Sequence, residues 1–377
     1  MKAKLSIIFL SMLATTSSFA EGGVTLYGLI DEGIGFTNNA GGRQAWQMQS
    51  GWVAGDRWGL KGSEGLGGGY DAVFTLENGF DLNSGSLGQS GRMFGRQAFV
   101  GIRSNEFGTF TAGRQYDSVV DYLGPLTANG GFAGWPFSHP YDNDNTDNSF
   151  RFNNAIKYTS GNYGGFSFGG AYAFSNQAGG FSNNRSYSVG VRYIGGPLSA
   201  AFAYLQANNP GRNASGALST DDTNFIAGRQ RIWGGAITYT WQSATFGVNY
   251  THSELDNPTG SAYLGTLPAG VSSLKFDNFE INGRYQFSPT LFALAMYTFT
   301  DARFNASTGT SKPKWHQGGL MVDYFLSKRT DFYAQAVYQH ATGSTGTLLD
   351  NAYITGAAGI SSDRSQVLAR VGIKHAF

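Results

Sequence analysis

The stretch RSYSVGVRYI, residues 185–194, decides the fold class, because its apolar and polar side chains alternate with a period of two. In an extended strand successive side chains point to opposite faces, so this segment has one apolar face and one face of polar or small residues. The segment therefore predicts a β-strand that separates an apolar environment from water. The apolar face is formed by Tyr187, Val189, Val191 and Tyr193, and the opposite face by Ser186, Ser188, Gly190 and Arg192.

The same period of two recurs at residues 70–77, 245–250, 332–339 and 367–377. Residues 291–300 differ, because both of their faces are apolar, which predicts either a subunit interface or a lumen wall covered by a loop. Beyond the first 20 residues the sequence has no run of 18 apolar residues, so a helical membrane protein is excluded. With 55 Gly and a mean hydropathy of −0.24, the chain suits strands that alternate between lipid and a wet lumen.

The connections between the predicted strands fall into two length classes that alternate along the chain. Eight long loops and seven short turns join sixteen strands, which predicts an all-β fold, a 16-stranded antiparallel transmembrane β-barrel. A soluble β-sandwich also has alternating strands, but its outer surface should be polar, and here apolar faces carry aromatic residues near strand ends. The short turns are predicted at 62–68, 104–108, 160–165, 195–197, 242–244, 287–289 and 327–330, and the long loops at 38–45, 81–91, 117–149, 175–184, 207–230, 253–273, 301–313 and 341–363.

The first 20 residues have the features of a secretory signal peptide. Two lysines precede an apolar run at 5–14, and Ser-Phe-Ala at 18–20 matches a small-x-small cleavage pattern. Residues 21–377 are then expected to form the barrel domain. Cleavage would leave 24 basic against 25 acidic residues, a formal charge of −1, which argues against nucleic-acid binding. The lack of Cys fits passage through an oxidising compartment.

Seven short motifs spread over the chain share a common likeness: GDRWGLKG at 55–62, FTLENGF at 74–80, GRMFGRQ at 91–97, GRQYD at 113–117, NAIKY at 154–158, SKRT at 327–330 and VGIKHAF at 371–377. In these motifs the chain resembles the general, non-specific porins of Gram-negative bacteria, particularly the β-proteobacterial type. The resemblance implies an outer-membrane channel for passive diffusion of small hydrophilic solutes and ions. It also implies a homotrimer, contact with outer-membrane lipids and lipopolysaccharide, an inward-folded third loop that narrows each pore, and a C-terminal aromatic read by the barrel-assembly machinery.

A basic wall across from the third loop is the main predicted site. Arg57 and Lys61 lie four residues apart on one strand, and the apolar Trp58 and Leu60 have the opposite parity, so both cations should face water. Porins similar to this chain have a basic wall in the constriction, and the matching motifs place Arg57, Arg114 and Arg151 in it, with Arg96 as a further candidate. Strict alternation does not support Arg114, which is expected beyond the last paired residue of its strand.

The third long loop, 117–149, is the longest, and its prolines and aromatic residues predict a packed loop that sets the pore width. Many general porins carry Pro-Glu-Phe-Gly-Gly and a carboxylate cluster on this loop, whereas this chain has NGGFAGWP at 129–136. Its acids lie toward the loop ends: Asp117 and Asp121, then Asp142, Asp144 and Asp147. With cations converging and few anions facing them, we expect a preference for small anions.

Catalytic, cofactor and metal sites are not expected from the sequence. DNDNTD at 142–147 starts like a calcium loop, but Asp147 replaces the required Gly and Asn153 the required Glu, which leaves at most a loosely bound surface ion. Outer-membrane hydrolases also use barrels, yet no nucleophile and base are singled out by spacing. A receptor-transporter would need a plug domain, for which a strand that opens at Val24 leaves no room. A substrate-specific channel with the same barrel remains the closer alternative.

Overall fold

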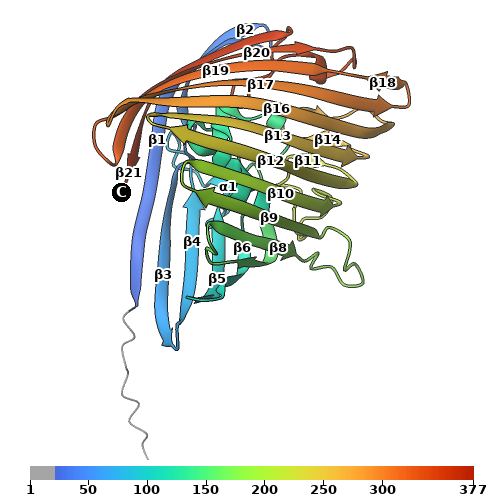
Figure 1. Cartoon of the computed structure of the whole chain (residues 1–377). Helices are drawn as coiled ribbons and strands as arrows, with labels where there is room; N and C mark the ends of the chain where they lie inside the picture. The colour runs from blue at the N-terminus through green and yellow to red at the C-terminus, as the bar shows by residue number, and fades with distance from the viewer. Residues whose placement is uncertain (1–21) are drawn as a thin grey trace, which may run out of the picture.

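Eighteen β-strands in the computed structural model, which describes residues 22–377, pair antiparallel in one continuous sheet (Figure 1). β1 (Gly23–Ala40) pairs with β21 (Ser365–Ala376), and this pairing closes the sheet into a barrel. Two barrel strands are each divided into two segments, so the eighteen segments form sixteen barrel strands. The divided strands are β2 (Arg43–Ser50) with β3 (Arg57–Gly67), both paired with β1, and β18 (Gly309–Ser311) with β19 (Lys314–Phe325), both paired with β17 (Leu291–Ala306).

The remaining barrel strands follow one another around the sheet in chain order, as the predicted topology requires. They are β4 (Tyr70–Gly79), β5 (Gln97–Ser104), β6 (Gly108–Gln115), β7 (Phe152–Thr159), β8 (Phe166–Ala173), β9 (Ser186–Gly195), β10 (Leu198–Asn208), β12 (Arg229–Trp241), β13 (Ala244–Asp256), β16 (Val271–Ser288) and β20 (Thr330–Thr342). A small second sheet in the loops consists of β11 (Phe225–Ile226), β14 (Gly260–Ser261) and β15 (Gly265–Thr266). The 16-stranded antiparallel barrel is therefore confirmed.

Alternation along the strands gives the barrel two different surfaces. In β17, Phe292, Leu294 and Met296 face inward and are buried, while Tyr297 faces outward and is exposed. The outward face carries exposed apolar side chains in adjacent strands, where Phe202 pairs with Val191, and Val248 pairs with both Ile237 and Ile281. A continuous exposed apolar band of this kind is typical of a surface that meets lipid. Within residues 22–377, none of the helices is long and apolar enough to cross a membrane.

Three connections were wrongly predicted in length. The expected loop at 38–45 is a two-residue turn at Gly41 and Gly42, whose φ angles of +60° and +92° are strained for other residues and allow Ala40 to pair with Arg43. β17 and β18 extend through much of the expected loop at 301–313. β3 continues through the glycines of the expected turn at 62–68 as far as Gly67. Glycine-rich stretches can pair in a sheet, so composition alone placed these boundaries wrongly.

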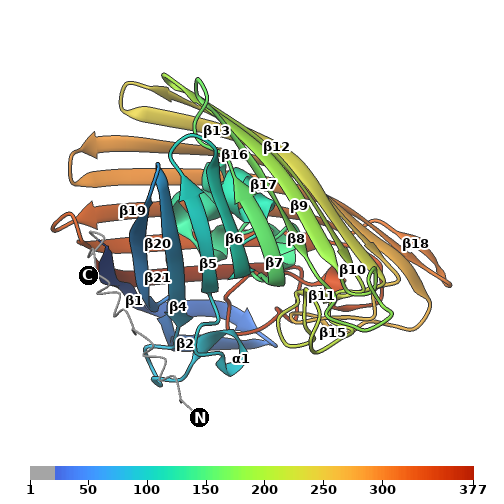
Figure 2. The same ribbon diagram turned by 90° about the horizontal axis from the view of Figure 1, so that it is seen from below.

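The third long loop, residues 116–151 between β6 and β7, lies against the inner wall of the barrel (Figure 2). It contains the short helical turns η1 (Val119–Leu123), η2 (Gly124–Leu126), η3 (Asn129–Ala133), η4 (Trp135–Phe137) and η5 (Pro140–Asp142). Gln317 Nε2 on β19 donates to the Ser138 carbonyl at 3.1 Å, and Gln335 Nε2 on β20 donates to the Ala133 carbonyl at 2.6 Å. These bonds tie the loop to strands far from its own ends.

The apolar inner face of β17 is explained by this loop. Leu294 and Met296 belong to the same buried cluster as Phe137 and Ala133 of the third loop. Of the two alternatives predicted for 291–300, a lumen wall covered by a loop is therefore confirmed.

A second long loop, residues 209–228 between β10 and β12, also folds back over the lumen, which the sequence did not predict. Its Ala217 and Leu218 are buried in one cluster with Val119 and Phe150 of the third loop. The two loops therefore pack against each other, and the Asn153 backbone N–H at the start of β7 also donates to the Ala217 carbonyl at 2.9 Å. The remaining helical turns are α1 (Gly88–Gly91) and η6 (Leu348–Asp350).

Candidate functional site

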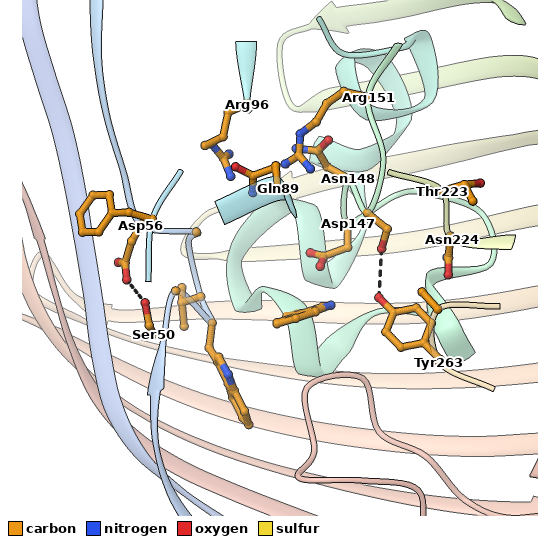
Figure 3. Close-up of a pocket in the computed structure, with 18 residues that line it drawn as sticks. Ser50, Asp56, Gln89, Arg96, Asp147, Asn148, Arg151, Thr223, Asn224 and Tyr263 are labelled. Carbon is orange, nitrogen blue, oxygen red and sulfur yellow. Dashed lines mark hydrogen bonds between the residues drawn. The ribbon is translucent and has the colours of Figure 1, made fainter. Parts of the chain in front are cut away.

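A cavity of about 470 Å³ lies where the third loop, the loop 209–228 and the break between β2 and β3 meet (Figure 3). The side chains around it come from segments that are far apart in the sequence. Its polar lining includes Asp56, Arg96, Asp147, Asn148, Arg151 and Asn224, and its aromatic lining consists of Trp52, Phe80, Trp135 and Tyr263. The cavity thus combines charged groups with aromatic surfaces inside the barrel.

Arg151 and Arg96 supply the two cations of this cavity. Arg151 is only 5% exposed, and its guanidinium lies 5.6 Å from the centre of the Tyr116 ring, yet it forms no ion pair within the described chain. Arg96 is 7% exposed and is paired, since its Nε donates to Glu77 Oε1 at 2.8 Å and its Nη2 donates to the Tyr116 hydroxyl at 3.1 Å. Burial lowers the pKa of Arg151 to about 10, with the Arg96 charge acting in the same direction, so Arg151 stays cationic at neutral pH.

Arg114 is held by an ion pair and does not line the cavity. Its Nη1 and Nη2 donate to the two carboxylate oxygens of Asp222 at 2.5 and 3.0 Å, and its Nε donates to the Gly95 carbonyl at 2.8 Å. The expectation that Arg114 lies beyond the last paired residue was wrong, because Arg114 pairs with Ala98 of β5. A register shift between Gly113 and Gln115, a β-bulge, changes the parity at this point instead.

Arg57 and Lys61 lie on one inward-facing row of β3, but the cavity lining includes neither. Arg57 is half-buried, and Glu77 on the adjacent strand β4 interacts with both Arg57 and Arg96. Lys61 is exposed and lies over the Tyr27 ring at 5.1 Å. Four residues of strand separate the two cations by about 13 Å. Lys61 therefore belongs to the lumen on the short-turn side of the cavity.

The structure places Asp117 and Asp121 at the start of the third loop, outside the cavity lining. Asp117 is fully buried and its Oδ1 accepts the Val119 N–H at 2.7 Å, while its Oδ2 accepts the Asn145 amide at 2.7 Å. Burial raises the pKa of Asp117 to about 7. Asp121 forms an ion pair with Lys157 of β7. Asp117 thus joins the start of the third loop to its end, and Asp121 ties the loop to β7.

Asp147 is the acid of the third loop that reaches the cavity. Its carboxylate points into the space below Arg96 and Arg151 in Figure 3, and it forms no ion pair with the residues described. Burial raises the pKa of Asp147 well above its usual range, a change that the nearby charge of Arg151 only partly opposes. The raised pKa favours the neutral form of Asp147, so this acid compensates the charge of Arg151 less than an exposed aspartate would.

A buried polar cluster, the loop anchor, fixes the third loop to the opposite wall. His139 Nδ1 lies 2.6 Å from Asp144 Oδ2, and His139 Nε2 lies 3.4 Å from Glu280 Oε2 on β16. Glu280 Oε1 also accepts the Ala128 N–H at 2.9 Å. Burial alone would lower the pKa of His139, but the two carboxylates raise it to about 10, so the ring is an imidazolium at neutral pH.

Sequence reasoning missed several residues that shape this site. Glu77 lies on the polar face of its predicted strand, so its position in the alternation could have indicated that it pairs with a cation in the lumen. Asp222 and Glu280 left no such signal, because their partners are more than 100 residues away in the chain.

The described residues contain no group of three or more side chains suited to a metal ion. Both carboxylate oxygens of Asp142, in the segment that starts like a calcium loop, instead accept the backbone N–H groups of Asp147 and Ser149, each at 3.1 Å.

Comparisons with known proteins agree with the architecture. The family model of the Gram-negative porins matches residues 8–344. An outer membrane porin of Bordetella pertussis is 31% identical over 356 residues, which cover 85% of this chain and 89% of the relative. Outer membrane porin protein 32 of Delftia acidovorans is 30% identical, over 99% of this chain and 100% of the relative.

The solved structures that match include an anion-selective porin from Comamonas acidovorans, with a TM-score of 0.72 and 24% identity over 95% of this chain and 100% of that chain. OmpT of Vibrio cholerae, solved in a trimer form, has a TM-score of 0.67 and 18% identity, over 94% of this chain and 99% of that chain. These relatives are channel proteins of the outer membrane rather than enzymes. The chain belongs to the Gram-negative porin family and is a multi-pass protein of the outer membrane.

Proposed function

We propose that this porin forms a water-filled channel for passive diffusion of small hydrophilic solutes and ions, with a preference for anions. The observation that carries the proposal is Arg151, a buried guanidinium that lines the cavity without a carboxylate partner among the described residues. A buried charge without a partner is costly, so an anion that enters the cavity gains more than a cation does.

Asp56, another acid of the cavity lining, accepts hydrogen bonds from the Asp31 N–H and the Ser50 hydroxyl, and the remaining charges near the cavity support the same preference. The carboxylate of Glu77 is paired with Arg96, and Arg57 forms no ion pair with residues 22–377, which leaves an excess of positive charge on this wall. Burial raises the pKa of Asp147, which favours the neutral form of the acid that faces the arginines. We propose Arg57, Arg96 and Arg151 as the constriction cations, with Lys61 and the paired Arg114 acting more weakly.

Planar bilayer recording of the purified protein tests this proposal. Stepwise conductance increases in KCl are expected, together with a zero-current potential in a KCl gradient that indicates anion preference. A film that stays silent after protein addition would reject the channel, and cation preference would reject the selectivity while leaving the channel intact.

We further propose that the protein assembles as a homotrimer. We also propose that residues 1–20 are removed as a signal peptide. These 20 residues lie outside the described part of the chain. The trimer form of the related OmpT structure and the apolar outward face of the barrel support the assembly. The same face is proposed to contact outer-membrane lipids and lipopolysaccharide. Chemical cross-linking in detergent should yield a ladder that ends at three chains, and mass spectrometry of the mature N-terminus should begin at Glu21.

A further inference from the structure

The cavity has an aromatic wall that anion passage alone does not require. Trp135 is fixed there by its backbone N–H, which donates to the Trp52 carbonyl at 2.9 Å. The two indoles flank one glycine, since a Cβ on Gly356 would lie 3.4 Å from Trp52 and 3.8 Å from Trp135. Trp52 is further held by Arg370, whose guanidinium lies 4.8 Å from the ring. The aromatic wall is therefore built on fixed residues.

Tyr263 continues this aromatic wall from the loop 257–270. Its ring packs against Tyr353 at 5.7 Å between centroids, and its hydroxyl lies 3.2 Å from that of Ser149 (Figure 3). Chloride or another small hydrated ion gains nothing from such a surface and loses part of its hydration beside it. A solute with a flat apolar body would bury that body against Trp135 and Tyr263.

The arginines keep donors free for a carboxylate in the same cavity. Arg96 uses Nε and Nη2 for Glu77 and Tyr116, while its Nη1 faces Gly55, where a Cβ would lie only 2.8 Å from it. The lack of a side chain at Gly55 keeps this donor accessible. The guanidinium of Arg151 is more than nine-tenths buried and is not paired with a carboxylate of residues 22–377. Arg151 Nη2 donates to the Asn148 side-chain oxygen at 2.9 Å, which leaves the other N–H groups of Arg151 and Nη1 of Arg96 for a planar carboxylate.

We propose that this cavity is a binding site for aromatic carboxylates, with the carboxylate at Arg151 and Arg96 and the ring against Trp135 and Tyr263. The inference rests on the proposed anion-preferring channel and names the class of solute that this channel takes up best. The cavity volume of about 470 Å³ lies within the range of about 300–1,000 Å³ that is typical of ligand sites, and it suits a solute with a single ring.

Benzoate and acetate are compared as blockers of the chloride current. The comparison separates the contribution of the aromatic ring to binding from that of the carboxylate charge. Both carry one carboxylate, so an arginine site without aromatic recognition binds them equally. We expect half-maximal block by benzoate at a concentration about tenfold below that of acetate. The Trp135→Leu and Tyr263→Leu variants should each bring the two concentrations to within about twofold, whereas Arg151→Gln should weaken both about tenfold and keep their ratio.

Trp241→Leu is the matched control, since Trp241 is an exposed residue at the far end of β12 and does not line the cavity. It should keep the wild-type ratio, and each variant is first required to give wild-type heat-modifiable trimers. Equal block by benzoate and acetate in the wild type would overturn the inference, as would an unchanged ratio in both Trp135→Leu and Tyr263→Leu. If the channel prefers anions in KCl but is blocked equally by benzoate and acetate, the proposed function stands and only the aromatic site is rejected. Cation preference in KCl would reject the proposed anion selectivity itself.

Discussion

Two buried cations at the third loop, His139 and Arg151, have opposite surroundings. His139 lies between the carboxylates of Asp144 and Glu280, at 2.6 and 3.4 Å, and is fully buried. Arg151 is nearly as buried, but it borders the cavity and forms no ion pair with residues 22–377. A compensated buried charge fixes the position of a loop, whereas an uncompensated one in a wet cavity is left to interact with solutes. The comparison separates the structural part of the constriction from its selective part.

Removing the cation of the loop anchor should have the largest effect. His139→Leu leaves Asp144 and Glu280 facing each other in a buried site, and breaking such a pair costs about 3–5 kcal/mol. Urea unfolding of the refolded protein in detergent, followed by tryptophan fluorescence, should show this loss. Single-channel conductance should rise, because the loop is freed from the β16 wall.

His340→Leu provides the control for this variant. His340 faces outward near the end of β20 and contacts Ser365 rather than the third loop. If His139→Leu matched this control in both unfolding free energy and conductance, the loop anchor would have no structural role.

The wild-type protein should lose part of its stability in alkaline solution. The pKa of His139 is raised from 6.5 to about 10 in the folded state, so its contribution is complete below pH 6.5 and disappears as the pH rises through 10. Unfolding free energies measured at intervals from pH 6 to pH 10 should therefore decrease. The His139→Leu variant should have a flatter profile, and equal slopes for the two proteins would argue against a charged His139.

Ion selectivity should change with pH through Asp147. Its raised pKa leaves it neutral in acidic solution, and deprotonation at higher pH adds a negative charge beside Arg151, so anion preference should fall as the pH rises. Between pH 5 and pH 9, Asp147→Asn should reduce the change in the anion-to-cation permeability ratio by about twofold. The rest of the change is expected from Asp56, which lines the same cavity and whose pKa is raised to about 6 by burial. The exposed Asp363→Asn variant should behave as the wild type, and a variant of Asp147 with the wild-type slope would exclude this residue.

The smallest effect is expected at the surface ion pair of the loop 209–228. Arg92 Nη2 lies 2.7 Å from Asp221 Oδ1, and the side chains are 26% and 54% exposed. Arg92→Gln should lower the unfolding free energy by no more than about 0.5 kcal/mol, with less effect at high salt. Asp222→Asn is the informative contrast, because it breaks the buried pair with Arg114 and should destabilise far more. Similar losses from both variants would show that burial does not decide the strength of these pairs.

The barrel could be predicted from the sequence because each strand carries its own evidence. Alternation at residues 185–194 depends only on neighbours along the chain, and β9 (Ser186–Gly195) has the predicted faces. The parity of Arg57 and Lys61 was readable for the same reason. Arg114 was misplaced because a one-residue bulge after Gly113 reverses parity without a mark in the local pattern.

Contacts made by the long loops could not be predicted in this way. Asp222 meets Arg114 from 108 residues away, and Glu280 meets His139 from a strand on another part of the barrel. Loops lack a repeating pattern, so their side chains have no parity from which to infer a direction. The combination of Arg151 with the aromatic wall at Trp135 depends on the same loop packing, and only the structure brings these residues together.

The role of Arg151 in anion preference is tested by the zero-current potential, measured for wild-type and Arg151→Gln channels in the same KCl gradient at neutral pH. We expect anion preference in the wild type and an anion-to-cation permeability ratio about three- to tenfold lower in the variant. Arg329→Gln, which removes the same charge from an exposed turn, should keep the wild-type value. An unchanged potential in Arg151→Gln, or cation preference in the wild type, would contradict the account.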